Sequence, residues 1–407
     1  MFKNPINLAF EVLTSQLDEP KWLQKKRSNA LKKFQDYGIP THKSELWKYT
    51  NTKKLERLEE VTDIAESGSV LFSDSSLSEK QNTQTEKGTD PKTEQLFVFT
   101  IEGELPKNTQ MQDILQIDEK NWKNIKTDKE RTFVELNTAM LNGGFQLTIP
   151  KNSQLKLHIQ YQQISKDWEN IRTVINVGEN AELDLTESYD YDCRINHVSV
   201  INMTADSRLK FQSNKLLRKT AALIHFSQIN CAQNVTIQQG AVNNNAALSH
   251  TIQEVNFNGQ HSKFEAASVN VAHDSCHISE NILTNHKVQN CKSNVLKRSL
   301  ATDKASIAIN AKAIVSKGAD GSDVAQSLKN ILLTDDANIY SRPELEINTD
   351  DVIAAHGSTV GELDETSLTY LRSRGIPKEQ AKFMLIESFL QDANIFNTED
   401  FLDRIEL

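Results

Sequence analysis

Residues 178–185 read GENAELDL, a polar turn followed by alternating apolar residues, and the same kind of unit returns three times along the chain. The later copies are TADSRLKF (204–211), CAQNVTIQ (231–238) and NGQHSKFE (258–265), so successive units begin at positions 178, 204, 231 and 258. Such alternation is typical of a strand with one buried face. A turn-and-strand unit at a nearly fixed interval predicts stacked rungs, each of which buries its inward side chains against the next.

The repeats therefore favour a mainly β fold built on a right-handed parallel β-helix core. Alternating stretches begin at about residue 145, and turns of similar composition continue to TDDANIYS (334–341) at less regular spacing. We expect this core to occupy residues 136–347. A β-sandwich is the alternative, because it also needs many short strands separated by polar turns.

Helical regions are expected on both sides of the core, at residues 1–135 and 348–407. The first contains an amphipathic helix at 21–37 with a basic outer face, and Gly38 supplies the left-handed conformation that commonly ends a helix. The stretch at about 66–95 is dominated by polar and charged residues, which predicts a mobile loop.

Two helices joined by a tight turn are expected near the C-terminus. Asp364 can cap the first helix, Gly375 closes it, and Pro377 suits the first turn of the second. In the second, KEQAKFMLIESFL (378–390), apolar residues cover roughly 260° of the helical circumference, which is wider than one contact surface requires. Either a third helix at 398–407 covers the remainder within the chain, or a partner protein does.

The composition of the 407 residues argues against several classes of protein. A formal net charge of −9 does not suit a stand-alone nucleic-acid binder. The four cysteines are widely spaced and include no C-x-x-C pair, which indicates a reducing compartment. The N-terminus lacks the apolar stretch of a signal peptide, and no run is long enough to span a bilayer. We expect a cytoplasmic chain with neither nucleic acid nor membrane as a partner.

The signatures of common enzymes are absent: the sequence has no phosphate loop, dinucleotide fingerprint, nucleophile elbow or H-E-x-x-H pair. The densest group of ligand-type residues is AHDSCHISE (272–280). In a strand, His273 and His277 would share one face while Cys276 pointed to the other, so we interpret them as side chains of a rung rather than a metal site. No catalytic or cofactor-binding residue is predicted.

His356 is the strongest single candidate for ligand chemistry. It is followed by Gly357, small residues flank it, and Asp350 and Asp351 precede it closely. An imidazole in this setting could bind iron through one nitrogen while a carboxylate fixes the other. The alternative is a histidine packed inside the fold.

The stretch SRPELEINTDDVIAAHGSTVGELDETSLTYLRSRGIPKEQAKFMLIESFL (341–390) resembles, without gaps, the SufB/SufD family of iron–sulfur cluster assembly proteins. GIPTHKSELWKYT (38–50), LNTAMLNGGFQLTIP (136–150) and SLKNILLTDDA (327–337) resemble further segments of that family. The tail motif HGSTVG is of the SufD kind, because SufB proteins show S-H-E-A-A-V-G at this place. One departure is Ala354, which stands where many relatives have a cysteine, so no thiolate ligand is expected from that position.

The resemblance implies a scaffold subunit without catalysis of its own. It would pair with SufB through the β-helix, bind the ATPase SufC through its C-terminal helices, and allow a homodimer when isolated. It would hold no cofactor tightly, only a transient iron–sulfur cluster shared with SufB near His356, and the resemblance leaves the role of a flavin open. The residues expected at the ATPase contact are Leu368, Tyr370, Leu371, Arg372, Arg374, Gly375, Phe383, Met384, Phe389 and Leu390.

Two alternatives share the expected fold. A β-helix enzyme acting on carbohydrates would need a cleft of carboxylates and basic residues on its rungs, with acids of separated pKa. A homodimeric structural protein would differ only in its partners.

Overall fold

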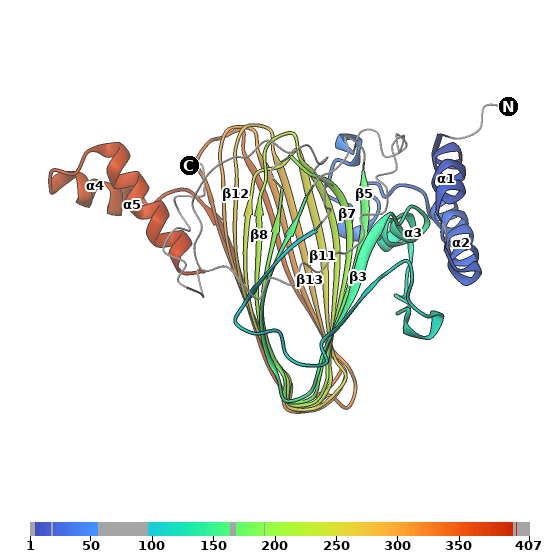
Figure 1. Cartoon of the computed structure of the whole chain (residues 1–407). Helices are drawn as coiled ribbons and strands as arrows, with labels where there is room; N and C mark the ends of the chain where they lie inside the picture. The colour runs from blue at the N-terminus through green and yellow to red at the C-terminus, as the bar shows by residue number, and fades with distance from the viewer. Residues whose placement is uncertain are drawn as a thin grey trace, which may run out of the picture.

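The computed structural model describes residues 5–17, 19–55, 97–162, 168–190, 192–393 and 396. Its centre is a parallel β-solenoid in which two nine-stranded sheets face each other and converge at one set of turns (Figure 1). The prediction of a mainly β solenoid flanked by helices is confirmed. The β-sandwich alternative is wrong, because neighbouring strands within each sheet are mostly parallel and one full turn of the chain apart.

The first sheet, sheet A, has the order β1-β4-β6-β8-β10-β12-β14-β16-β18. Its strands are β1 (Phe97–Glu102), β4 (Gln154–Tyr161), β6 (Glu182–Tyr189), β8 (Arg208–Leu216), β10 (Thr236–Asn244), β12 (Lys263–Ala272), β14 (Lys292–Ala301), β16 (Ser322–Leu332) and β18 (Val352–Gly361).

The facing sheet, sheet B, has the order β17-β15-β13-β11-β9-β7-β5-β3-β2. Its strands are β2 (Gln110–Asp113), β3 (Gly143–Ile149), β5 (Glu169–Val177), β7 (Arg194–Met203), β9 (Ala222–Cys231), β11 (Leu248–Phe257), β13 (His277–His286), β15 (Ser306–Val315) and β17 (Asn338–Ile347).

The repeat in the sequence is the length of one rung. In the middle of the stack Thr236 lies opposite Lys263, a step equal to the interval between the repeated units. Closer to the C-terminus Lys292 lies opposite Asp323, which is a longer step along the chain. The rungs therefore lengthen toward the C-terminus, which explains the loss of strict spacing there. Most of the polar turns place Asn or Asp at a position with a left-handed backbone, as at Asn234 with φ 56°, and the turn before β12 places His261 there with φ 63°.

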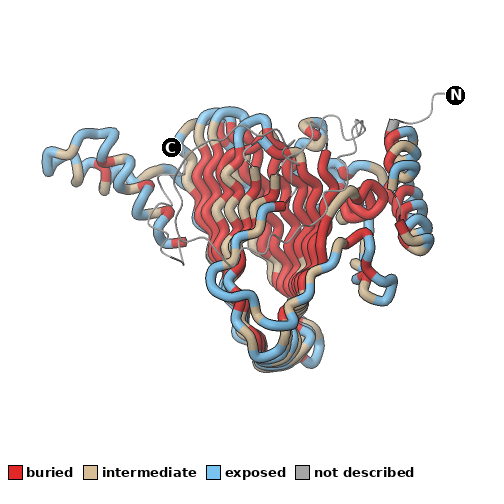
Figure 2. The backbone as a smooth tube through the Cα atoms, viewed as in Figure 1, coloured by how far each residue is buried: buried red, intermediate tan, exposed pale blue. Residues whose placement is uncertain are grey.

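The solenoid interior is apolar near the turns and polar in between. Cys231, Ile237, Phe264 and Ile278 belong to one continuous buried cluster that runs along the stack. Within the polar band, Nζ of Lys297 lies 2.6 Å from a carboxylate oxygen of Glu280. Figure 2 shows the resulting stack of buried strands.

A ladder of asparagines links five successive rungs of sheet B. Asn202 donates to Asn176 at 2.8 Å, Asn230 to Asn202 at 3.0 Å, Asn256 to Asn230 at 3.3 Å and Asn285 to Asn256 at 3.2 Å. Each side chain satisfies its neighbour's polar groups, so the ladder helps to fix the register between rungs.

Three helices cover the outer face of sheet B: α1 (Pro5–Gln16), α2 (Lys21–Tyr37) and α3 (Thr132–Ala139). Gly38 has φ 71° and donates its N–H to the carbonyl of Phe34, so it ends α2 as predicted. Short 3-10 helices are η1 (Glu45–Trp47), η2 (Thr52–Lys54), η3 (Glu119–Asn121) and η4 (Lys129–Arg131).

The predicted domain limits need two corrections. Residues 1–135 are not only helical, since β1 and β2 pair antiparallel with β4 and β3. At the other end, β18 pairs with β16, so the solenoid continues to Gly361 rather than ending at residue 347. The loop predicted at 66–95 lies outside the described residues, as does the third helix predicted at 398–407.

Two C-terminal helices, α4 (Glu365–Ser373) and α5 (Lys378–Gln391), follow the last strand. They extend from the sheet A side of the solenoid, opposite the N-terminal helices (Figure 1). No helix in the described part of the chain is both long and apolar enough to cross a bilayer.

Candidate partner-binding and cluster site

At its C-terminal end, which we call the open end, the described part of the solenoid stops at β17 and β18 without a further rung. β17 pairs only with β15 and β18 only with β16, so each of these strands has one outer edge to which no described residue pairs. Nine of the ten residues of β18 are exposed, whereas strands in the middle of the stack are largely buried. Unpaired backbone groups along a long strand are a template for another strand.

His356 lies in the middle of β18, directly opposite the buried Gln326 of β16. Its side chain continues an inward-directed column, because side chains at alternate positions share one face of a strand. Ser358, on the same face, donates to Ser341 of β17 at 2.7 Å, so this face looks toward the opposing sheet. His356 is nevertheless exposed. The alternative of a histidine packed inside the fold is wrong.

The carboxylate partner that the sequence suggested for His356 is not found among the described residues. No hydrogen bond or ion pair joins its imidazole to Asp350, Asp351 or any other residue in the described part of the chain. Ala354 lies two residues before it, on the same face and opposite Val324. Any side chain at position 354 would therefore stand beside the imidazole.

The helical hairpin of α4 and α5 begins and turns as predicted. The carboxylate of Asp364 accepts from the backbone N–H groups of Thr366 at 3.1 Å and Ser367 at 3.2 Å, which caps α4. Gly375 has φ 89° and follows the end of that helix. The hairpin thus has the sharp turn that the sequence pattern required.

The wide apolar arc of α5 is divided between two surfaces. Ile386 and Leu390 pack with Val269 and Leu300 on the outer face of sheet A. Arg298 of that face forms an ion pair with Asp392 at 3.2 Å. The sheet therefore covers one side of α5, and the other side is exposed on the projecting hairpin (Figure 2).

The ten residues predicted for the ATPase contact fall into three groups. Leu368 and Leu390 are buried within the chain, where they act as packing residues, and Leu371 and Phe389 are half-buried. The exposed residues are Tyr370, Arg372, Arg374, Gly375, Phe383 and Met384.

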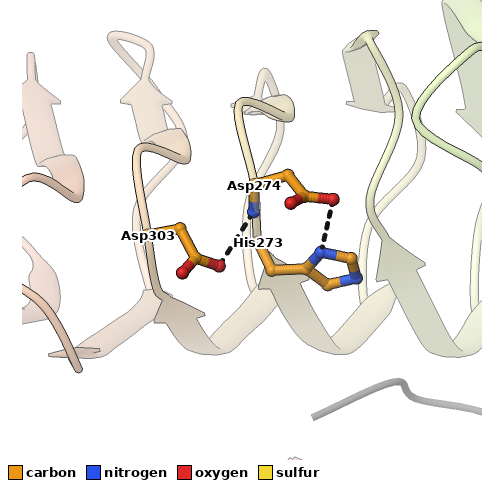
Figure 3. Close-up of side chains that lie close together, drawn as sticks. All are labelled: His273, Asp274 and Asp303. Atoms are coloured by element: carbon orange, nitrogen blue, oxygen red, sulfur yellow. Dashed lines mark hydrogen bonds and ion pairs between the residues drawn. The ribbon is translucent and has the colours of Figure 1, made fainter.

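The group of His273, Cys276 and His277 does not converge, but the reason differs from the predicted one. The three residues do not share a strand, because β12 ends at Ala272 and β13 begins at His277 after a turn. His277 is buried, and its ring lies 3.4 Å from the hydroxyl of Thr50. Nδ1 of His273 instead lies 3.3 Å from the carboxylate of Asp274, whose backbone N–H donates to Asp303 (Figure 3). Asp303 comes from the next rung and was missed, although it lies one period away.

The ligand atoms of His273, Asp274 and Asp303 all lie within 4.8 Å of one another. Asp303 already accepts the backbone N–H of Asp274 at 3.0 Å, and Lys219 lies 3.8 Å from the Asp274 carboxylate. Both aspartates occupy left-handed turn positions, with φ 56° and 55°. Turn geometry explains these residues, and we assign no metal to them.

The four cysteines are free, buried side chains of the solenoid. Burial raises the pKa of each thiol, most strongly at Cys193 and Cys231. Since the thiolate is the iron ligand, none of them is prepared to hold a cluster at neutral pH. On the inward face of β18, His356 is the described residue whose exposed side chain can bind iron.

The model of the SUF system FeS cluster assembly SufBD core domain matches residues 137–389, which cover the solenoid from β3 onward and nearly all of the hairpin. The chain belongs to the SufB/SufD family. The family's iron–sulfur cluster assembly role agrees with the expectation from the tail motif.

Individual relatives support the SufD type. The iron–sulfur cluster assembly protein SufD of Bacillus subtilis is 26% identical over 413 residues, covering 91% of this chain and 89% of the relative. SufD of Escherichia coli is 36% identical over 99 residues, covering 24% and 23%. A SufBD family protein of Mycobacterium tuberculosis is 36% identical over 143 residues, covering 33% and 36%.

Proposed function

We propose that this chain is a non-catalytic scaffold subunit of an iron–sulfur cluster assembly complex. In this proposal it pairs with a SufB subunit through the open end of its solenoid and binds the SufC ATPase through the projecting hairpin. The observation that carries the proposal is the open end itself: two strands of ten residues, each with one edge to which no described residue pairs.

Pairing through this end is supported by the exposed apolar side chains and the unpaired strand edge of β18. β18 exposes Ile353, at 72%, and Val360, at 46%, and the backbone groups along its outer edge pair with no described strand. Natural sheets usually shorten, charge or cover such an edge, because it invites aggregation. A partner with the same rung geometry would pair with both edges and continue both sheets. SufB has the chemistry of such a partner, since it belongs to the same family.

Binding of the ATPase through the hairpin is supported by its exposed side chains. Tyr370, Phe383 and Met384 are exposed by 58%, 45% and 39%, and Arg372 and Arg374 lie close by in the sequence. Aromatic, Met and Arg side chains are enriched at protein interfaces. The hairpin presents them away from the solenoid, so a partner there would not obstruct the open end.

A nascent cluster would be cargo at the contact with SufB rather than a resident cofactor. His356 supports this, since its imidazole lies exposed at the open end and would become enclosed once a partner rung is added. Ala354 leaves the sulfur ligands to the partner. We propose no tightly bound cofactor for the isolated chain, and four free buried thiols suit a reducing cytoplasm.

The alternatives predict different surfaces. A carbohydrate-active enzyme could not use the carboxylates inside the solenoid, Glu187 and Glu280, because both are buried. A homodimeric protein would bind a second copy of itself through the same open end. The homodimer hypothesis therefore differs from the proposed pairing with SufB only in the partner.

The test is co-expression of this chain with SufB and SufC, followed by size-exclusion chromatography with mass measurement. Val360→Asp places a charge on the open face and should abolish SufB capture while leaving the melting temperature within a few degrees. Lys263→Glu, on an exposed position of β12, is the matched control and should have no effect. If the Val360→Asp variant still bound SufB, or if the native chain formed homodimers that exclude SufB, the proposed pairing through the open end would be wrong.

A further inference from the structure

A cavity of about 460 Å³ lies between the N-terminal helices and sheet B. It is lined by α2, by the segment from Trp122 to Thr127, by α3 and by β5. This volume suits a small molecule. Lysines of the basic face of α2 line this cavity, and the proposed role in cluster assembly assigns no function to that face.

The side of the cavity nearest sheet B is formed by Arg172 of β5, which is only 4% exposed. Its Nη2 donates to the hydroxyl of Thr138 at 2.7 Å and its Nε to Oδ1 of Asn137 at 3.3 Å. Its guanidinium carbon lies 4.5 Å from the centre of the Trp122 ring. No described carboxylate lies within ion-pair distance of it.

A buried guanidinium without a direct counter-ion is unusual, because an unpaired buried charge is costly. Burial lowers the pKa of Arg172 to about 9; Glu135 opposes this effect, and the nearby positive charge of Arg27 adds to it. The nearby carboxylate of Glu135 does not form an ion pair with Arg172, so the guanidinium lacks a direct counter-ion among the described residues. A bound anion would supply it.

Lysines of α2 add to this positive charge. Nζ of Lys26 donates to Asn124 at 2.8 Å, and Nζ of Lys33 lies 2.9 Å from a carboxylate oxygen of Glu135. Burial lowers the pKa of Lys26, and the charge of Arg172 acts in the same direction. The cations that line the cavity are Lys26, Lys32, Lys33 and Arg172, against two acids, Asp36 and Glu135. The cavity is thus positive in a chain whose net charge is −9.

The aromatic ring in the cavity is already engaged. Trp122 has Arg172 at 4.5 Å, Lys26 at 5.7 Å and the edge of Trp22 at 5.6 Å, measured to ring centroids. It holds the cations in place rather than offering a platform for a planar ring. A compact anion fits this arrangement better than a nucleobase.

We propose that this cavity binds a small multivalent oxyanion of the phosphate type, with Arg172 as its buried anchor and Lys26 and Lys33 at its sides. Nε and Nη2 of Arg172 already donate to Asn137 and Thr138, whereas Nη1 has no described acceptor and can donate to an anion oxygen. Such charge-assisted hydrogen bonds are the strong ones. Lys33 would exchange part of its contact with Glu135 for the ligand.

The test is calorimetric titration of the full chain, at constant ionic strength, with inorganic phosphate, pyrophosphate and glycerol phosphate. Saturable binding of one anion per chain is expected. Tighter binding of glycerol phosphate would identify the phosphate group of a larger molecule, and tighter binding of the inorganic anions would identify a free oxyanion. Failure of all three to saturate the protein in the millimolar range would overturn the proposal.

Variants separate a site from general charge attraction. Lys26→Gln should weaken binding by about tenfold, the effect of losing one charged hydrogen bond. Lys25→Gln, at an exposed position of the same helix outside the cavity lining, should leave binding unchanged. Equal losses in both would contradict the proposal. Arg172→Gln should abolish binding; should it fail to fold, Lys26→Gln and Lys33→Gln decide the question.

Discussion

His356 of β18 lies directly opposite Gln326 of β16, yet Gln326 is 5% exposed and His356 is open to solvent. Both occupy the same inward column of the solenoid, so the difference arises from their place in the stack. Gln326 has a rung beyond it, whereas no described rung lies beyond His356. A protein that continues the stack would bury the imidazole without altering the fold of this chain.

The division of α5 into a docked and an exposed side gives the first prediction. Met384→Glu and Phe383→Glu alter exposed positions, so the variants should fold normally and lose SufC in a pull-down from co-expressing cells. Buried anchors of an interface often contribute about 2 kcal/mol or more each. Leu390→Ala should instead destabilise the chain by about 2 to 5 kcal/mol, since Leu390 is fully buried against sheet A.

Melting temperature and SufC recovery should be measured for each hairpin variant beside Lys263→Glu as a charge control. Full SufC recovery by both folded glutamate variants would mean that the ATPase binds elsewhere. A normal melting temperature for Leu390→Ala would mean that α5 does not depend on its contact with the sheet.

Short sequence patterns correctly predicted the turns of the solenoid and the ends of α4, because these features depend on neighbouring residues. The period of the polar turns predicted the rungs, because most turns place Asn or Asp at a left-handed position. Asp364 and Gly375 predicted the limits of α4, because capping depends on neighbouring backbone groups. The same period predicts that Asp303 follows Asp274 by one rung, so this contact was available in the sequence.

Other features depend on contacts that the sequence pattern does not display. β18 lacks apolar alternation, since no described rung covers its inward face, and its strand form depends on pairing with β16. Arg172 lies within IRTVINV, which looks like an ordinary buried strand. Its proposed role as an anion anchor depends on the cavity that forms where α2 and α3 cover the outer face of sheet B. In both cases the decisive neighbour is far away in the chain.

Glu187 gives a prediction about pH. Burial raises the pKa of its carboxyl group to about 7, against the opposing effects of the Tyr161 hydrogen bond and the charge of Lys215. The folded chain therefore holds this proton between about pH 4.5 and 7 when the unfolded chain has lost it. The contribution of Glu187 to stability must fall as pH rises through this window, by at most roughly 3 kcal/mol.

Glu187→Gln removes this titration and keeps an oxygen that can accept from Tyr161, which lies 2.6 Å from Glu187. The variant should therefore gain stability relative to the native chain on going from pH 5 to pH 8. Urea unfolding midpoints at the two pH values measure this, with Glu179→Gln, in the exposed turn before β6, as the matched control. An equal stability difference at both pH values would show that the carboxyl group does not titrate in this range.

Position 354 offers a gain-of-function prediction. Ala354→Cys places a thiol on the same face as His356, where thiolate and imidazole can bind one iron atom together. The complex with SufB should then retain more iron and sulfide after gel filtration. Ile353→Cys, which places the thiol on the opposite face of the same strand, is the control and should give no gain. Equal gains in both variants would indicate unspecific iron binding by exposed thiols.

The last prediction concerns His356 itself. His356→Ala removes an exposed side chain without a described hydrogen bond or ion pair, so the free energy of unfolding should change by less than about 0.5 kcal/mol. If His356 holds or positions the nascent cluster, iron and sulfide in the purified complex should drop, because losing one contact of this kind commonly costs about ten- to a hundredfold in metal affinity. Thr359→Ala, exposed on the other face of β18, should change neither quantity. The two measurements must be made on the same preparation. A large fall in melting temperature would assign His356 a structural role, and an unchanged cluster content in a stable complex would remove it from the cluster site.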